Sequence, residues 1–382
     1  MVASTVVGLM GTDLVLPAVP QLPEALGTTA SSAQLVLAAY VGGTCVGLLV
    51  YGALSERVYT GRLFTGSLIA TATVSLACGM ARSTEELIAL RAIQGAAAAA
   101  PAVFAPAIVK ALFDETRAIR AMGLLGSIES LAPAIAPIVG AGLLLVGDWR
   151  LSFFVLAASA GALAVLLGVS GRLPQVGRRT RGGYAVLIRD AVFMRYALSQ
   201  AFILGGLLTF VFGLPAVLVR VFGGTLTDFI TIQVLAILTF VVAANLAGRA
   251  VARFGAERII VVGTALCVVG AAGQFWYALC GGAEPFVILA LFAPVNIGLG
   301  LRGPPGFYRA IMASRGDDAR GSALVILGIL GTTALGTLTA SPFIELGTVP
   351  LSGITLALQT AALLCLVALP ALPTSDLAQP SS

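Results

Sequence analysis

The stretch Leu16-Pro17-Ala18-Val19 recurs as Leu214-Pro215-Ala216-Val217, an offset of 198 residues. A second match consists of three residues that stand five apart and has an offset of 196. In this match Gly52, Arg57 and Arg62 recur as Gly248, Arg253 and Arg258. Both matches are short, but their offsets nearly agree and they fall at equivalent places in the two halves of the chain. The sequence therefore predicts an internal duplication in which the second half repeats the first in the same direction.

Twelve apolar segments follow one another, each about as long as the roughly 20 residues needed to cross a hydrocarbon core. They are 3–20, 32–54, 63–81, 86–108, 122–146, 151–170, 192–214, 227–248, 259–279, 285–308, 321–343 and 350–372. If Met1 starts in the cytoplasm, 17 of the 22 Lys and Arg residues fall in cytoplasmic connections or, for Arg195, at the cytoplasmic end of a segment. Of the other five, Arg82, Arg150 and Arg220 fall outside, and Arg91 and Arg302 fall within helices. Because cytoplasmic loops retain Lys and Arg, this pattern predicts a multi-pass bacterial inner-membrane protein with both termini cytoplasmic.

The composition excludes several classes of function. A mean hydropathy of +1.02 and a charged content of 10% are typical of helical membrane proteins. The formal net charge of +5 is then a signal of topology rather than of nucleic-acid binding. The chain has no histidine, and its only lysine, Lys110, stands in no phosphate-binding loop. We therefore expect no enzyme activity, no metal and no cofactor, with any uphill transport drawing on an ion gradient such as the proton gradient, or on a partner chain.

The longest basic connection, 171–190, lies between the sixth and seventh apolar segments and carries five arginines. It divides the chain into two halves of six helices each. We expect an N-terminal six-helix bundle over 1–170, a cytoplasmic loop over 171–191, a C-terminal six-helix bundle over 192–373 and a cytoplasmic tail over 374–382. The predicted fold class is an all-α membrane protein with twelve transmembrane helices.

Six stretches carry a resemblance to a known family. The stretch Thr12–Pro20 resembles the first-helix signature of the Bcr/CflA group of drug:proton antiporters, in the major facilitator superfamily. Four further stretches are similar to the group's motifs in the second loop, the fourth helix, the fifth helix and the turn after it: 52–57, 90–95, 131–140 and 148–150. The stretch 313–323 resembles the connection before the eleventh helix in chloramphenicol and florfenicol exporters. The resemblance covers nearly the whole chain.

This resemblance implies a major facilitator fold of two six-helix bundles, with the substrate site at the membrane midplane between them. It implies a proton-coupled antiporter that exports small hydrophobic drugs or metabolites by alternating access. It also places Gly52, Glu56 and Arg57 in a loop that latches the cytoplasmic side through charge pairs. The loop departs from the family pattern at Glu56 and at positions 59–61, so its role as a latch stays open. Because the first helix begins at Met1 without a cytoplasmic leader, we expect a truncated start.

Four ionisable residues are predicted well inside helices: Asp13, Arg91, Glu129 and Arg302. An unpaired charge at membrane depth costs at least ~2.5–3.5 kcal/mol on insertion scales, so such residues usually pair, line a cavity or bind protons. From a rise of roughly 1.5 Å per residue, Asp13 and Arg91 fall in the outer half of the membrane and Glu129 and Arg302 toward the cytoplasm. The register therefore allows two acid–base pairs, one at each depth.

Asp13 is the strongest candidate for proton coupling. Its counterpart in the repeat is Val211, so the duplicated scaffold does not require a carboxylate there. A carboxyl group in a low-dielectric cavity can lose its proton when a cation approaches, which is what a proton-coupled exchanger needs. The alternative is a structural aspartate that caps backbone groups freed by Pro17. Glu129 could relay a proton, bind a cationic or zwitterionic substrate, or neutralise Arg302 as a latch.

Arg91, Gln94 and Gly95 share one face of a helix at i, i+3 and i+4. One interpretation is a polar cluster near Asp13, with Gly95 allowing a neighbouring helix to come close. The other is that Arg91 is structural and snorkels to the outer surface. The two remain open.

Pro133, Pro137 and Gly140 fall in the fifth predicted helix, where we expect them to serve helix bending and close packing rather than ligand contact. Phe210 and Asn245 are candidate contacts in the substrate cavity, together with the polar residues above. For any single aromatic residue, packing or lipid contact is the alternative.

Three functions are compatible with these features. The first is proton-coupled export of small hydrophobic compounds, such as amphenicol-like antibiotics or a self-made metabolite. The second is proton-coupled import of a small nutrient or siderophore, because the fold does not determine direction. A non-transporting scaffold or sensor is disfavoured, since the short loops offer no docking surface. We expect a monomer whose partners are its substrate, protons and the lipid bilayer, with no nucleic acid.

Overall fold

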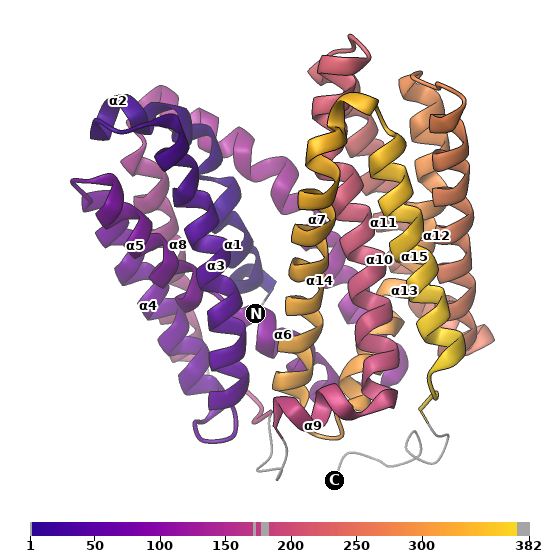
Figure 1. Cartoon of the computed structure of the whole chain (residues 1–382). Coiled ribbons are helices and arrows are strands. Elements are labelled where there is room, and N and C mark those ends of the chain that lie inside the picture. Colours follow the sequence, from indigo (N-terminus) through magenta and orange to yellow (C-terminus); the bar gives the residue numbers. More distant parts are fainter. Residues whose placement is uncertain (1, 171–172, 177–182, 373–382) are drawn as a thin grey trace. The chain divides into compact units, whose positions relative to one another are not determined.

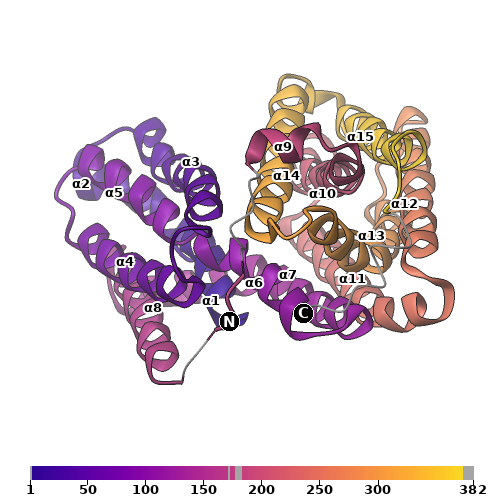
Figure 2. The same cartoon turned by 90° about the horizontal axis from the view of Figure 1, so that it is seen from below.

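The computed structural model describes residues 2–170, 173–176 and 183–372. Within these ranges every regular element is a helix, and twelve helices are long and apolar enough to cross a membrane. The prediction of an all-helical protein with twelve spans is therefore confirmed. The chain forms two compact units (Figures 1 and 2). Unit 1 comprises Met1–Ala111, Ile128–Arg181 and Gly316–Ala323, and unit 2 comprises Leu112–Ser127, Gly182–Arg315 and Leu324–Ser382.

Unit 1 contains most of the first six spans. The first span is broken into α1 (Val2–Asp13), the 3-10 helix η1 (Leu16–Gln21) and α2 (Leu22–Leu26). The next spans are α3 (Ala30–Leu54), α4 (Thr60–Met80), α5 (Thr84–Ala97) with α6 (Ala100–Leu112), α7 (Glu115–Val146) and α8 (Arg150–Ser170). Thr29 and Ser83 cap the N-termini of α3 and α5, because the hydroxyl of each accepts a hydrogen bond from a backbone N–H of the first turn.

Unit 2 contains most of the last six spans. They are α10 (Ala191–Ala216) with the π-helical η2 (Val217–Val221), α11 (Leu226–Phe254), α12 (Ala256–Leu279), α13 (Pro285–Ala313), α14 (Asp318–Ala340) with the 3-10 helix η3 (Ser341–Leu346), and α15 (Val349–Ala368). A short helix, α9 (Tyr184–Arg189), lies across the end of the unit at which α10 begins (Figure 1). Thr225 and Asp228 form a reciprocal capping box that begins α11.

Several helices extend further than hydropathy predicts, α7 and α11 among them. The fifth span was predicted from residue 122, but α7 begins at Glu115, where the Asp114 carboxylate accepts a hydrogen bond from the Arg117 backbone N–H. The eighth span was predicted to end at residue 248, and α11 continues to Phe254. Both extensions are polar, so the helix continues past the apolar stretch that hydropathy detects.

Glycines allow neighbouring helices to come close in each unit. In unit 1 a Cβ on Gly43 of α3 would lie 1.9 Å from the carbonyl oxygen of Ala92 in α5. In unit 2 a Cβ on Gly298 of α13 would lie 2.5 Å from the carbonyl oxygen of Gly263 in α12. Neither distance leaves room for a side chain, and such contacts between backbones are how membrane helices associate without a hydrophobic driving force.

Much of the predicted central loop and the predicted tail lies outside the described residues. This applies to four of the five arginines of the loop, Arg172, Arg178, Arg179 and Arg181, and to the tail from residue 374. The expected bundle boundaries at these segments stay predictions.

Candidate functional site

The first membrane span is interrupted directly after Asp13. The Leu14 N–H donates to the carbonyl of Met10, as in an α-helix, but the Val15 N–H turns back to the carbonyl of Thr12. Because Val15 no longer bonds four residues back, the carbonyl of Gly11 loses its helical donor. Pro17, which has no N–H, then stands in the first turn of the 3-10 helix η1. The repeated sequence Leu214–Val217 also stands where an α-helix ends, since α10 stops at Ala216 and continues as η2.

The side chain of Arg91 takes up the freed carbonyl. Its Nη1 donates to the Gly11 oxygen at 2.8 Å and to Gln94 Oε1 at 2.6 Å, and its Nε donates to the Val36 oxygen at 3.2 Å. The guanidinium lies 4.3 Å from the centre of the Tyr40 ring, a cation–π distance, and none of the side chain is exposed. Arg91 is therefore a buried cap for the broken end of α1, and it does not snorkel to the outer surface.

A small polar network surrounds this arginine inside unit 1. The amide of Gln94 donates to Ser75 Oγ at 2.6 Å, and the Tyr40 hydroxyl donates to the Gly8 carbonyl at 2.6 Å. Gln94 is 1% exposed. A Cβ on Gly95 would lie 2.0 Å from the Tyr40 carbonyl oxygen, so glycine lets α5 approach α3 at this level. The structure thus brings Arg91, Gln94 and Gly95 together against the end of α1.

Asp13 stands apart from this network. It is half-buried, and within the described part of the chain no hydrogen bond or ion pair to its carboxylate is found. The expected pair of Asp13 with Arg91 is therefore not formed: Arg91 Nε and Nη1 bind the two carbonyls and Gln94, and Arg91 Nη2 has no hydrogen-bond partner among the described residues. The alternative of a capping aspartate gains no support either, because no backbone N–H of the described residues donates to the Asp13 carboxylate. What remains is a half-buried carboxylate at a helix break.

The fifth span meets the same break from another side. A Cβ on Gly140 would lie 2.3 Å from the carbonyl oxygen of Leu14, so α7 touches the backbone between α1 and η1. Gly140 is buried, whereas Pro133 is exposed and Pro137 is half-buried. The helix runs without interruption through both prolines. Of the three motif residues, Gly140 is thus the one with a close contact to the first span.

The two inner charges have partners of their own. Glu129 is half-buried in unit 1, and the Thr5 hydroxyl of α1 is its hydrogen-bond partner. Arg302 in unit 2 has no exposed surface and donates to the Ser199 carbonyl at 3.1 Å and to Ser199 Oγ at 3.3 Å. A Glu129–Arg302 latch was expected because two buried charges would neutralise one another. Since each side chain has a hydrogen-bond partner of its own, that argument is weaker.

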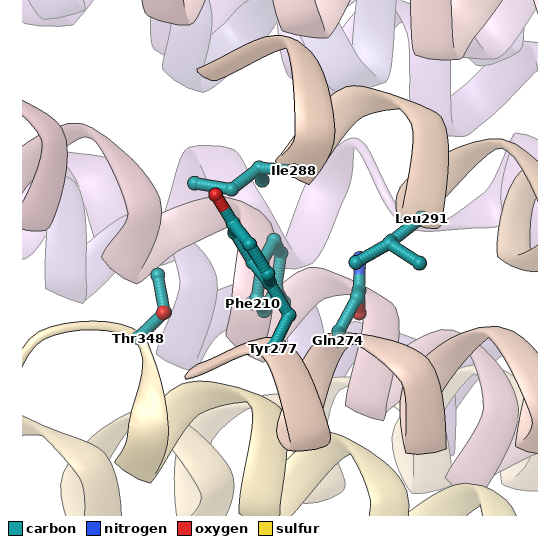
Figure 3. Close-up of a pocket in the computed structure, with 6 residues that line it drawn as sticks. All are labelled: Phe210, Gln274, Tyr277, Ile288, Leu291 and Thr348. Atoms are coloured by element: carbon teal, nitrogen blue, oxygen red, sulfur yellow. The ribbon is translucent and has the colours of Figure 1, made fainter. Parts of the chain in front are cut away.

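Phe210 and Asn245 occupy different surroundings. Phe210 is 1% exposed in the hydrophobic core of unit 2, with its ring centre 5.3 Å from that of Phe292. It borders a small pocket whose volume is only about 10 Å³ (Figure 3). The lining residues are Phe210, Gln274, Tyr277, Ile288, Leu291 and Thr348. This pocket is too small for a drug-sized substrate, and the expectation that Phe210 contacts the substrate stays a prediction. Asn245 is exposed and donates to Ser127 Oγ at 3.0 Å.

The loop after α3 makes an ion-pair cluster within unit 1. The Glu56 carboxylate accepts from the Arg320 guanidinium, which also donates to Asp317 at 2.9 Å. The hydrogen bond from Arg320 lowers the pKa of Glu56, whereas burial raises the pKa of Asp317. Gly52 is buried and its carbonyl accepts from the Ser55 hydroxyl. Arg57, the residue that keeps its place in the family motif, is exposed.

Two further ion pairs occupy equivalent positions of the repeat. Lys110 Nζ lies 2.8 Å from Asp318 Oδ1 in unit 1, and Arg309 Nη2 lies 2.7 Å from Glu115 Oε1 in unit 2. Lys110 and Arg309 are 199 residues apart, close to the repeat offset, and each ends the fourth span of its half. Their partners stand at the start of α14 and of α7, the fifth spans. The repeat thus carries a pair of related salt bridges.

These features were compared with known proteins. The family model described as the Major Facilitator Superfamily matches residues 1–338. The chain belongs to this superfamily. A chloramphenicol resistance protein of Pseudomonas aeruginosa is 26% identical over 341 residues, which cover 86% of this chain and 79% of that protein. A bicyclomycin resistance protein homolog of Haemophilus influenzae is 24% identical over 265 residues, covering 67% of this chain and 66% of that protein.

Solved structures show the same major facilitator fold. The transporter FucP, in the outward conformation, superposes with a TM-score of 0.73 at 16% identity, covering 96% of this chain and 97% of FucP. The human organic anion transporter MFSD10 gives a TM-score of 0.75 at 14% identity, with coverage of 96% and 97%. At these identities the likeness concerns the fold. The resemblance inferred from the motifs is thus confirmed, and this major facilitator chain is a transporter rather than an enzyme.

Sequence reasoning missed several residues of the candidate site. Tyr40 and Thr5 carry no motif, and their roles depend on which carbonyl or carboxyl lies opposite them in the folded unit. Lys110 and Arg309 could have been found, because two cations at the repeat offset, each at the end of a fourth span, are a usable signal.

Proposed function

We propose that this chain is a proton-coupled exporter of small hydrophobic drugs or metabolites that works by alternating access. The observation that carries the proposal is Asp13, a half-buried carboxylate without a bonding partner among the described residues, next to a broken membrane helix. Ionisable groups inside membrane helices usually mark substrate or proton pathways. Broken helices build the binding sites of many secondary transporters.

Asp13 has the setting that a coupling group needs. Arg91 binds the Gly11 and Val36 carbonyls and forms no ion pair with Asp13 in the described structure. A carboxylate that is free of a permanent partner can take up a proton in one state and release it when a substrate or a changed environment favours the charged form. Glu129, half-buried and bonded to Thr5, is a second proton site on the inner side.

The salt bridges of the repeat support the alternating-access part of the proposal. Lys110–Asp318 and Arg309–Glu115 each join the end of a fourth span to the start of a fifth span from the other half of the sequence. We propose that these pairs, together with Glu56–Arg320, form in one state of the cycle and separate in the other. Since each pair is partly screened from water, its separation has a cost that substrate or proton binding must offset.

Export is favoured over import by the relatives. Two of them are named for resistance to chloramphenicol and to bicyclomycin, which suggests that this chain also removes drugs from the cell. We propose that the chain acts as a monomer in the bacterial inner membrane. Termini on the cytoplasmic side fit the charge distribution of the loops.

Transport in inverted membrane vesicles tests the direction. When the vesicle interior is made acidic, an exporter that exchanges protons should concentrate chloramphenicol or bicyclomycin inside the vesicles, and a protonophore should abolish the accumulation. An importer would instead deplete the vesicles of its substrate under the same gradient. Accumulation that survives the protonophore would contradict proton coupling.

A further inference from the structure

The backbone between α1 and η1 is held from two sides. On one side Arg91 binds the carbonyl of Gly11 near the end of α1, and Tyr40 binds the carbonyl of Gly8 further back in the helix. On the other side Gly140 of α7 lies against the carbonyl of Leu14. We propose that Gly140 is a positioning residue, which sets the proton affinity of Asp13 by holding α7 against the break that carries it. This inference rests on the proposed role of Asp13 as a proton site.

Gly140 cannot be replaced without moving one of the two helices. Its missing Cβ would lie 2.3 Å from the Leu14 oxygen, 3.2 Å from the Leu14 carbonyl carbon and 3.2 Å from Pro17 Cγ. The first two atoms are backbone, and Pro17 is held by its ring, so none of the three can turn aside as a flexible side chain would. Leu14 is itself completely buried. A methyl group at position 140 must therefore separate α7 from the break.

The end of α1 has little freedom to follow such a movement. The Tyr40 hydroxyl would lie 2.2 Å from a Cβ on Gly11, so this residue is packed as tightly on the α3 side as Leu14 is on the α7 side. The Arg91 guanidinium, which binds Gly11, is itself fixed by Gln94 and by the Val36 carbonyl. Displacement of α7 would therefore open space at Leu14 and Pro17, beside Asp13.

The same helix also contacts α1 nearer the cytoplasm. Glu129 of α7 is the hydrogen-bond partner of Thr5, and Gly140 meets Leu14. The two contacts are 11 residues apart on α7 and 9 residues apart on α1, which fits two helices that run in the same direction. At roughly 1.5 Å per residue, they lie about 14–16 Å apart. A shift of α7 along α1 would change the surroundings of both carboxylates at once.

The charged and titratable groups around Asp13 come from four packed helices. Tyr40 of α3 is electrostatically coupled to Asp13, and Arg91 of α5 lies at the Gly11 carbonyl two residues away. Glu129 of α7 stands at the level of Thr5, and α8 carries only Arg150, which is bound to Asp148 at its first residue. None of these side chains bonds to Asp13 in the described structure, so the solvation of the carboxylate is the property that α7 can change.

The direction of the effect follows from this solvation. Water that enters beside a carboxylate stabilises its charged form, so the group releases its proton at lower pH. We therefore expect the Gly140→Ala change to shift the pH at which Asp13 is half-protonated toward acid by about one pH unit. Gly142→Ala is the matched control, because a Cβ on Gly142 has nothing within 4 Å.

Reaction with dicyclohexylcarbodiimide tests this without knowledge of the substrate. The reagent adds to a protonated carboxyl group in an apolar setting, so mass spectrometry of the Asp13 peptide at a series of pH values gives the midpoint of protonation. The full-length protein in liposomes should show a lower midpoint in Gly140→Ala and the wild-type midpoint in Gly142→Ala. Asp13→Asn identifies the modified site, and Glu129 is scored on its own peptide.

The outcomes separate this inference from the proposed function. If wild-type Asp13 shows no pH-dependent modification, the proposed proton site is wrong. If Asp13 titrates in the wild type and Gly140→Ala has the same midpoint, Gly140 does not position it and the inference is overturned alone. Should Gly140→Ala not accumulate in membranes, Pro17→Ala repeats the test from the first span, because it removes the ring carbon that lies against Gly140. An unchanged midpoint in Pro17→Ala would then overturn the inference, and an acid shift would support it.

Discussion

The guanidinium of Arg91 binds the carbonyl oxygen of Gly11 at 2.8 Å, across 80 residues of sequence, at the point where the first membrane helix ends. This contact explains how a helix can break inside a membrane, where an unsatisfied carbonyl would be costly. It also leaves Asp13, two residues further on, without the ion pair that its charge and depth would predict. One arginine thus both stabilises the break and keeps the neighbouring carboxylate available.

The role of Arg91 as a cap predicts a loss of stability in Arg91→Leu. The Gly11 carbonyl, which the break deprives of its helical donor, would be left unsatisfied, at about 1–3 kcal/mol. We expect a clearly lower unfolding temperature for the detergent-solubilised protein, with partial recovery in Arg91→Lys, which keeps one donor group. Arg82→Leu changes an exposed arginine and should leave the unfolding temperature unchanged. Equal unfolding temperatures for Arg91→Leu and the wild type would show that the cap is dispensable.

The salt bridges of the repeat predict energetic coupling within each pair. For Lys110–Asp318 and Arg309–Glu115, a double-mutant cycle of neutral substitutions should give a coupling energy of roughly 0.5–3 kcal/mol, measured by thermal unfolding. The exposed pair Arg117–Asp114 is the control, because its side chains are 74% and 59% exposed and exposed pairs contribute little. Strictly additive effects in both cycles would contradict the proposal that these pairs stabilise the state in which they form.

The cluster around Arg320 predicts opposite pH dependences for its two acids. The pKa of Glu56 is lowered from 4.5 by the hydrogen bond from Arg320, so its stabilising contribution is present above that value and is lost as the pH falls through the folded pKa. The pKa of Asp317 is raised from 3.8 by burial, so its contribution is present below that value and is lost as the pH rises through the folded pKa.

Thermal unfolding at several pH values checks these two signs. The loss of stability caused by Glu56→Gln should be largest near neutral pH and should shrink under acid conditions. The loss caused by Asp317→Asn should instead shrink as the pH rises. Parallel pH dependences for the two variants would contradict the assignment of Arg320 mainly to Glu56.

The orientation of the chain predicts labelling of one native cysteine. Cys280 is exposed at the end of α12, on the side that the charge pattern places outside the cell, whereas Cys78 and Cys267 are buried. A membrane-impermeant maleimide added to intact cells with a permeabilised outer membrane should label Cys280, and Cys280→Ser should lose this label. A cysteine introduced at Leu173 should stay unlabelled in the same cells. Labelling at position 173 alone would reverse the topology.

Much of the fold could be predicted from hydropathy and repetition. Segments of apolar residues locate the twelve spans. A segment that crosses lipid must satisfy its own backbone hydrogen bonds, so it forms a helix whatever its neighbours are. The Leu-Pro-Ala-Val repeat correctly marks two helix ends, since proline cannot donate the next helical hydrogen bond. Helix ends beyond the apolar stretch, such as Glu115–Arg120, could not be read from hydropathy.

The contacts within the candidate site were harder to predict from the sequence. From the sequence, Arg91 was expected near the first span as the ion-pair partner of Asp13. Opposite charges can be seen in a sequence, whereas a carbonyl freed by a helix break cannot. The contact of Gly140 with Leu14 depends on how two helices pack, to within an ångström. Phe210 was expected at the substrate cavity because aromatic residues suit apolar ligands, but its position on α10 places it in the core of unit 2.

The proton-coupling role of Asp13 is tested most directly by transport in inverted vesicles with an imposed pH gradient. The measurement compares wild type, Asp13→Asn and Glu24→Gln, a control that neutralises an exposed carboxylate of α2, for a compound that the wild type concentrates. We predict that Asp13→Asn loses pH-driven accumulation, while downhill exchange of the compound continues, and that Glu24→Gln accumulates it as the wild type does. Full pH-driven accumulation by Asp13→Asn would contradict the account and would move the proton site to Glu129 or elsewhere.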